Sequence, residues 1–198
     1  MRNPRPDIDL ASYAELFIGK KENLGRNDGP EIREWKRLLG PGVEQAKGIA
    51  WCAIYVFGTL MQRNGLTDRG ELLDALGWPR KKPAYLESCD WILQAAMSNG
   101  VPGLQLVDAP DRNDLGLLMA RRANGSYSKT DARHVYICRG PIDQADDLVP
   151  TVEGNTMPGL VEGAQSREGQ GVYARFRSVE PGRQVFVRLP NPLVEVSP

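Results

Sequence analysis

The sequence predicts an α+β fold, with N-terminal helices packed on a C-terminal antiparallel sheet of about five strands. Apolar residues recur at helical spacing up to about residue 98, and short strand-like runs separated by turn residues follow them. Helices that precede strands in this way favour packing on one face of an antiparallel sheet. The chain has 198 residues, a length typical of one domain, so we expect residues 1–198 to fold around one core.

Three helices are expected in the first third of the chain. Asp9 is placed to cap a helix that stops at Gly19. The turn at 27–30 leads into a second helix, which Gly40 ends. A third and strongly apolar helix spans about 50–63. The second helix carries apolar side chains at helical spacing, at Ile32, Trp35, Leu38 and Leu39.

A connection and a fourth helix complete the helical half. Residues 65–84 are expected to form the connection, with one short helical turn near 71–76. The fourth helix spans about 85–98. Its apolar stripe contains Leu86, Cys89, Leu93, Ala96 and Met97.

The second half of the chain contains short strand-like runs bounded by turn residues. They cover residues 115–120, 134–138, 151–155, 172–177 and 184–189. Apolar and polar residues alternate most clearly in the last of them. The two ends of the chain, 1–7 and 190–198, are expected to be short flexible tails.

The charge balance excludes some classes of partner. The chain has 25 basic and 25 acidic residues, so its formal net charge is zero. Nucleic-acid binders and polybasic membrane-surface proteins both need a positive surplus. The longest apolar run, 49–61, is too short to span a membrane, and the first residues do not resemble a signal peptide. We therefore expect synthesis in the cytoplasm, and delivery by other means if the protein acts elsewhere.

Cys52 is a candidate nucleophile because it lies in the first turn of the apolar helix. Free N–H groups at a helix N-terminus lower the pKa of a thiol and can hold an oxyanion. The alternative is a small core residue, since free cysteine is often buried. Core packing is the interpretation that we favour for Cys89 and Cys138. Three cysteines at these spacings predict neither a disulfide framework nor a zinc site.

His134 is the only histidine, and it opens one of the expected strands. A cysteine nucleophile needs a base within hydrogen-bond reach, and histidine is the usual one near neutral pH. On the next strand, Glu153 and Asn155 are expected to share a face, where either can hold the imidazole in the right tautomer. Gly154 between them permits a close backbone approach. Taken singly, these residues also fit a strand-edge histidine and a polar pair near a turn.

The order of these elements resembles that of papain-like cysteine hydrolases, and the sequence resembles the CHAP family of cysteine, histidine-dependent amidohydrolases/peptidases. Trp51 to Val56 is similar to the nucleophile motif of the family, and Glu153 to Thr156 is similar to its Glu-Gly-Asn segment. Further segments support the resemblance at Asn27 to Ile32, Asn113 to Leu115, His134-Val135, and Gly171-Val172 with Arg175 and Arg177. The chain departs from the family at Ala50, Asn113 and Tyr136, where proline, glycine and glycine are usual.

The resemblance implies a papain-like fold and a role for each matching residue. Cys52 would be the nucleophile, and His134 the general base and then the acid. Glu153 would orient His134, with Asn155 as the alternative or a helper. A Cys-His-His site is excluded by the single histidine. Residues 65–84 exceed what a minimal family member needs, so they are expected to be an insertion that serves as a lid or a specificity feature.

The activity implied by the resemblance is hydrolysis of amide bonds in bacterial peptidoglycan. The enzyme would be an N-acetylmuramoyl-L-alanine amidase or an endopeptidase, such as a phage lysin, acting as a monomer on the cell wall in the periplasm or outside the cell. Two alternatives stay open. One is a non-catalytic CHAP-like module that binds cell wall or forms part of a virion. The other is a wall-degrading toxin delivered into rival bacteria.

No cofactor or metal is expected. Asp108, Asp111, Asn113 and Asp114 form an acidic cluster before a strand, and a calcium loop can begin there. Arg122 stands where such a loop requires a bidentate glutamate, so calcium is not supported by a motif. A solvated turn is the interpretation that we favour.

Three acidic residues lie near the first segment of the resemblance. Glu22, Asp28 and Glu31 are placed to line a cleft. For Asp28, which stands just before Pro30, capping of the second helix explains the residue equally well.

Overall fold

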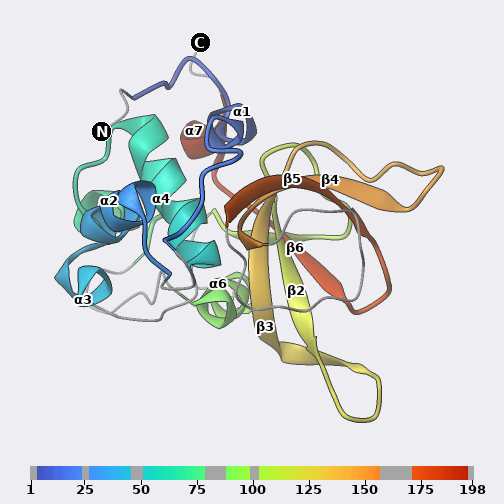
Figure 1. Cartoon of the computed structure of the whole chain (residues 1–198). Helices are drawn as coiled ribbons and strands as arrows, with labels where there is room; N and C mark the ends of the chain where they lie inside the picture. The colour runs from blue at the N-terminus through green and yellow to red at the C-terminus, as the bar shows by residue number, and fades with distance from the viewer. Residues whose placement is uncertain are drawn as a thin grey trace.

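The computed structural model describes residues 4–23, 27–45, 51–78, 88–98, 103–156 and 171–195. Helices gather on one side of the molecule and the strands form a sheet on the other (Figure 1). The helices are α1 (Leu10–Glu15), α2 (Pro30–Leu39), α3 (Pro41–Glu44), α4 (Cys52–Asn64), α5 (Arg69–Ala75), α6 (Cys89–Met97) and α7 (Asn191–Val194). The strands are β1 (Gln105–Val107), β2 (Leu115–Arg121), β3 (Tyr127–Cys138), β4 (Leu148–Thr156), β5 (Gly171–Ser178) and β6 (Gln184–Arg188). The predicted α+β class is confirmed.

The six-stranded sheet has the order β1-β6-β2-β3-β4-β5, and every neighbouring pair is antiparallel. Strands β2 to β5 follow one another along the chain, and β6 then returns to pair with β2. The prediction of about five strands missed β1. This edge strand has only three residues, too few for an alternating pattern to stand out.

The two faces of the sheet carry different side chains. Along β3, Val135 and Ile137 join the main core with the helices. Tyr136 and Cys138 point to the opposite face and belong to a smaller apolar cluster there. Tyr136 fits because Gly116 is its partner on β2, where a Cβ would lie 2.1 Å from the tyrosine ring. The departure of Tyr136 from the family pattern is therefore accommodated on the face away from the main core.

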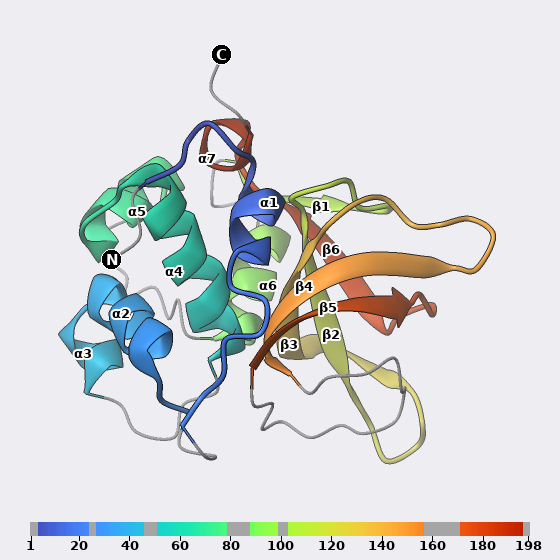
Figure 2. The ribbon, with the colours of Figure 1, turned by 45° about the horizontal axis from the view of Figure 1, so that its top comes forward.

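Helix α4 is the central element of the helical layer, and α1, α2, α5 and α6 surround it (Figure 2). Almost every residue of α4 is buried, as its apolar sequence predicts. Gly58 lets α2 approach, since a Cβ there would lie 2.4 Å from Cβ of Trp35. The helix ends at Gly65, whose φ of 68° is the left-handed conformation that glycine adopts most easily.

Helices α1 and α6 differ from their predicted extents. Asp9 caps α1 as predicted, with its carboxylate accepting from the Ser12 N–H, but the helix ends at Glu15 instead of continuing to Gly19. Helix α6 begins at Cys89, because its N-cap Ser88 is extended, so the predicted start near residue 85 is wrong. Met97 was expected on the apolar stripe of α6 but is 48% exposed, because it lies in the last turn of the helix.

The described part of the connection at 65–84 packs into the core. Helix α5 buries Leu72 and Leu73, and Leu76 and Trp78 follow them into the same cluster. Up to residue 78 this segment is therefore part of the helical layer, and the expectation of a lid is not met there. Residues 79–84 lie outside the described residues.

The described parts of the two predicted tails differ in burial. Residues 4–7 are exposed, whereas Leu193 and Val194 near the other end are buried. The fully buried Arg63 donates hydrogen bonds to the carbonyl oxygens of Ile8 and Leu193, at 2.6 and 3.0 Å, and to those of Pro6 and Glu195. One guanidinium at the end of α4 thus joins both ends of the chain. The sequence gives no sign of this role, because arginine is usually exposed.

No helix within the described ranges has the length and apolar character needed to cross a membrane.

Candidate active site

Cys52 is the first residue of α4, as the sequence predicts, and only 3% of its surface is exposed. The residue before it fixes this end of the helix. The indole Nε1 of Trp51 donates to the buried carboxylate of Glu22 at 3.3 Å, and its ring stacks on Trp35 with 6.2 Å between centroids. Glu22, which was expected to line a cleft, therefore anchors the residue that precedes the thiol.

His134 lies in the middle of β3 and does not open the strand, so the predicted start at 134 is wrong. The register against β2 shifts just before it: Leu118 pairs with His134, but Met119 pairs with Ala132. The extra residue, Arg133, makes a β-bulge. Bulges change the direction of neighbouring side chains and are frequent beside active sites.

Cys52, His134 and Glu153 come together at the contact between α4 and the sheet. Nε2 of His134 lies 3.0 Å from Oε2 of Glu153. The imidazole and the Cys52 thiol are close enough for each to shift the pKa of the other. Since Glu153 occupies Nε2, Nδ1 is the ring nitrogen left for the thiol.

The Glu153 carboxylate is fully buried and receives two further donors from the sheet. The Thr151 hydroxyl donates to Oε1 at 2.6 Å. Arg177 on β5 donates from Nε to Oε1 at 2.8 Å and from Nη2 to Oε2. From the sequence, Arg177 was noted only in a segment that supports the family resemblance, and Thr151 was predicted only to begin a strand. Both roles depend on strand register, which one sequence does not specify.

The electrostatics of the site favour charged Cys52 and His134. Burial disfavours charge on Glu153, but the hydrogen bonds and charges of Arg177 and His134 outweigh it and hold the pKa of Glu153 well below its usual range. Burial also lowers the pKa of His134, but hydrogen bonds to Cys52 and Glu153 raise it to about 9. A hydrogen bond from Cys89 lowers the pKa of Cys52, burial opposes this, and His134 lowers it further. A thiolate–imidazolium pair follows.

Cys89 is the residue that the sequence placed only in the core. It is buried, but it is also the first residue of α6, and its Sγ lies 3.6 Å from Sγ of Cys52. The hydrogen bond to Cys52 and burial both raise the pKa of Cys89. No sequence signal pairs these residues, because their contact depends on how two helices pack. Cys138 is buried on the far face of the sheet, as core packing predicts.

Gly154 and Asn155 follow Glu153 where β4 passes the start of α4. A Cβ on Gly154 would lie 2.6 Å from Cβ of Tyr55, so the predicted close approach is confirmed. The register shifts after Glu153, and Asn155 has a φ of 59°. Regular alternation is therefore broken, and the expectation that Glu153 and Asn155 share a strand face does not hold. Asn155 is buried, and the carboxylate that accepts a hydrogen bond from His134 is that of Glu153.

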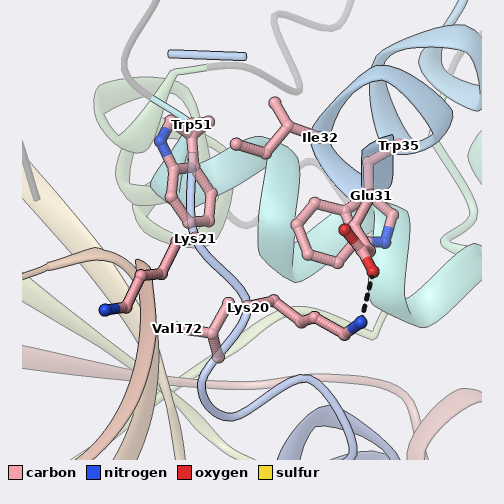
Figure 3. Close-up of a pocket in the computed structure, with 7 residues that line it drawn as sticks. All are labelled: Lys20, Lys21, Glu31, Ile32, Trp35, Trp51 and Val172. Carbon is pink, nitrogen blue, oxygen red and sulfur yellow. Dashed lines mark ion pairs between the residues drawn. The ribbon is translucent and has the colours of Figure 1, made fainter. Parts of the chain in front are cut away.

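A shallow hollow lies beside Trp51, between α2 and the start of β5 (Figure 3). Its lining residues are Lys20, Lys21, Glu31, Ile32, Trp35, Trp51 and Val172. Lys20 Nζ pairs with Glu31 Oε1 at 2.8 Å, and the Lys21 side chain points away from this pair (Figure 3). Of the three acidic residues expected near a cleft, Glu31 lines this hollow.

Asp28 is not the cap of α2. The N-cap residue is Gly29, without a side-chain hydrogen bond, and Pro30 begins the helix. The Asp28 carboxylate instead pairs with Arg33 at 3.1 Å.

The acidic cluster before β2 serves as a structural contact. Arg188 pairs with Asp111 at 2.7 Å and with Asp114 at 2.8 Å. Asn113 has a φ of 77°, a left-handed conformation that glycine adopts most easily. Its Oδ1 accepts a hydrogen bond from the Ala11 N–H at 2.9 Å. Within the ranges that the structure describes, no three His, Cys, Asp or Glu residues are arranged to hold a metal ion.

A comparison of the chain with models of known protein families found no match, and the curated proteins and the solved structures gave none either.

Proposed function

We propose that this protein is a cysteine hydrolase of the CHAP type that cleaves an amide bond in the peptide of bacterial peptidoglycan. The observation that carries the proposal is the arrangement of three groups. His134 lies close enough to the Cys52 thiol to lower its pKa, and Nε2 of His134 lies 3.0 Å from the buried Glu153 carboxylate. Nucleophile, base and orienting group in this order are the requirements of acyl transfer by a cysteine.

In the proposed reaction each residue has one step. The Cys52 thiolate attacks the scissile carbonyl, and the free N–H groups at the start of α4 face the developing oxyanion. His134 gives its Nδ1 proton to the leaving amine as the C–N bond breaks, and an S–C bond remains. The imidazole then takes a proton from water, which releases the acid and frees the thiol. Glu153 stays ionised throughout and holds the proton on Nε2.

The peptidoglycan substrate rests on the resemblance of the motifs around these residues. Either an N-acetylmuramoyl-L-alanine amidase or an endopeptidase would use the same chemistry. We place the action of the enzyme at the cell wall, as a phage lysin or as a toxin delivered into rival bacteria.

The replacement Cys52→Ala tests the proposal. Wild-type protein should release new amino groups from purified peptidoglycan, and Cys52→Ala should release none, because the nucleophile is gone. Circular dichroism should show the same fold in both proteins. Equal release by the two proteins would refute the role of Cys52.

A wall-binding module without activity is the second candidate, and the burial of Cys52 favours it, since a buried thiol is difficult for a large substrate to reach. Co-sedimentation with cell walls separates the two candidates. Wild-type protein that sediments with walls but releases no amino groups at any pH, with or without calcium, would establish the binding module.

A further inference from the structure

The thiols of Cys52 and Cys89 lie together at the point where two helices begin. Cys52 is the first residue of α4, and Cys89 is the first residue of α6. Their Sγ atoms are 3.6 Å apart, and both residues are buried. A disulfide bond is about 2.05 Å long, so the two sulfur atoms must approach by about 1.5 Å. Rotation about the two Cα–Cβ bonds moves sulfur atoms by this order of distance.

We propose that Cys52 and Cys89 form a redox site, in which a peroxide converts the two thiols to a disulfide that reversibly inactivates the nucleophile. The regulatory part of this inference rests on the proposed function, because it assigns the nucleophile to Cys52. The formation of the disulfide does not rest on it.

The two residues are suited to the two steps of this oxidation. The Cys52 thiolate attacks one oxygen of the peroxide, the O–O bond breaks, and Cys52 becomes a sulfenic acid while hydroxide leaves. The Cys89 thiol then attacks the sulfenic sulfur, and an S–S bond forms as its proton leaves with the hydroxyl group as water. In total the two thiols lose two electrons and two protons, and the peroxide is reduced to two molecules of water.

The surroundings of the pair support the same division of roles. The hydrogen bond with Cys89 lowers the pKa of Cys52, burial opposes this, and the nearby His134 lowers it further. Cys89 keeps its proton, since the neighbouring thiolate and burial both raise its pKa. Only 3% of Cys52 and 7% of Cys89 is exposed, so a small oxidant such as hydrogen peroxide fits the site better than a protein disulfide.

Cys138 provides a matched control within the same chain. It is also a free, buried cysteine, but it lies on the opposite face of the sheet with Tyr136, Val149 and Phe186. A peroxide effect that depends on the Cys52–Cys89 contact should therefore be unchanged in Cys138→Ser.

The test treats full-length protein with hydrogen peroxide and follows it by mass spectrometry and by thiol labelling. Wild type and Cys138→Ser should lose two hydrogens per chain and give a Cys52–Cys89 linked peptide, and dithiothreitol should reverse both changes. In Cys89→Ser the sulfenic acid has no thiol partner, so Cys52 should proceed to the sulfinic acid, which dithiothreitol does not reduce.

Two results would overturn the redox site: the absence of the linked peptide in oxidised wild type, or full recovery of Cys89→Ser by dithiothreitol. Hydrolysis of peptidoglycan is measured on the same samples, and wild type should lose it with peroxide and regain it with dithiothreitol. A linked peptide in a protein without hydrolytic activity would uphold the disulfide and refute the proposed function. Full activity of the linked protein would refute the inactivation.

Discussion

The Glu153 carboxylate is surrounded by donors from three strands: His134 on β3, Thr151 on its own strand β4, and Arg177 on β5. A buried charge is costly unless it is paired and hydrogen-bonded. The hydrogen bonds that stabilise Glu153 also hold His134 in position and favour its charged form. Arg177 is therefore a positioning residue in the proposed mechanism, because it acts on Cys52 through Glu153 and His134.

Replacement of Arg177 by Met should destabilise the fold and weaken the imidazolium. Removal of one partner of a buried ion pair costs about 3–5 kcal/mol. Loss of the guanidinium should also raise the pKa of Glu153, which then stabilises charged His134 less. Urea unfolding measures the first effect, and the alkaline limb of kcat/KM against pH measures the second.

Arg133→Met is the control for this replacement. Arg133 lies beside His134 but forms only an exposed ion pair with Asp131, and such pairs contribute about 0–1 kcal/mol. Arg177→Lys keeps the positive charge but loses the contact made through Nε and Nη2. Its stability and its pH profile should therefore lie between those of Arg177→Met and Arg133→Met. Equal stability and equal pH profiles of Arg177→Met and Arg133→Met would contradict the positioning role.

The pH dependence follows from the raised pKa of His134. Hydrolysis by the thiolate–imidazolium pair requires protonated His134, so kcat/KM should fall as the pH rises through about 9. Glu153→Gln removes the negative neighbour, which lowers the pKa of His134 and moves the alkaline limb to lower pH. An alkaline limb that stays in place in Glu153→Gln would show that Glu153 does not set the charge of His134.

At the scale of elements, the site depends on how closely α2, α4 and β4 approach one another. Two glycines provide this closeness: Gly58 faces Trp35 of α2, and Gly154 faces Tyr55 of α4. Trp35 in turn stacks on Trp51, which precedes the nucleophile. The packing of the helices and the position of the thiol are therefore connected through one aromatic contact.

Gly58→Ala tests the packing of α2 on α4. The new Cβ would lie 2.4 Å from Cβ of Trp35, so the helices must separate, at a cost of about 1–3 kcal/mol. Gly42 in α3 is the matched control, because a Cβ there meets nothing within 4 Å and Gly42→Ala should gain about 0.5–1 kcal/mol. Thermal unfolding of both variants checks the difference, and equal melting temperatures would contradict it.

The sequence predicts elements well where a local pattern specifies them. Helix α4 could be predicted from its apolar run, and the place of Cys52 at its start followed from that. The bulge before His134 and the contact of Cys52 with Cys89 could not be predicted, because both depend on pairing between distant segments. The same reason explains why Arg177 was associated with a strand and not with the site.

At the scale of the whole molecule, the helical layer and the sheet meet along the line where the site lies. Cys52 belongs to α4, His134 to β3, Glu153 to β4 and Arg177 to β5, and α4 contacts β3 and β4. The formal net charge of the chain is zero, so its overall charge provides no long-range attraction to an anionic surface.

The order of helices and strands was enough to predict the α+β class, because one face of each element needs a core. The contact of both chain ends with Arg63 was not predictable, since it depends on the position of one buried arginine. Within segment 65–84, the apolar residues Leu72, Leu73, Leu76 and Trp78 belong to the core, which the sequence did not predict.

The most direct test of the central claim is digestion of purified peptidoglycan in water enriched in ¹⁸O, followed by mass spectrometry of the soluble fragments. Hydrolysis through Cys52 should give fragments with a new amine and a new carboxyl group that carries ¹⁸O, and their masses locate the bond that is cut. The same digestion with Cys52→Ala should give none of these fragments. Labelled fragments from Cys52→Ala, or none from the wild-type protein at any pH, would contradict the account.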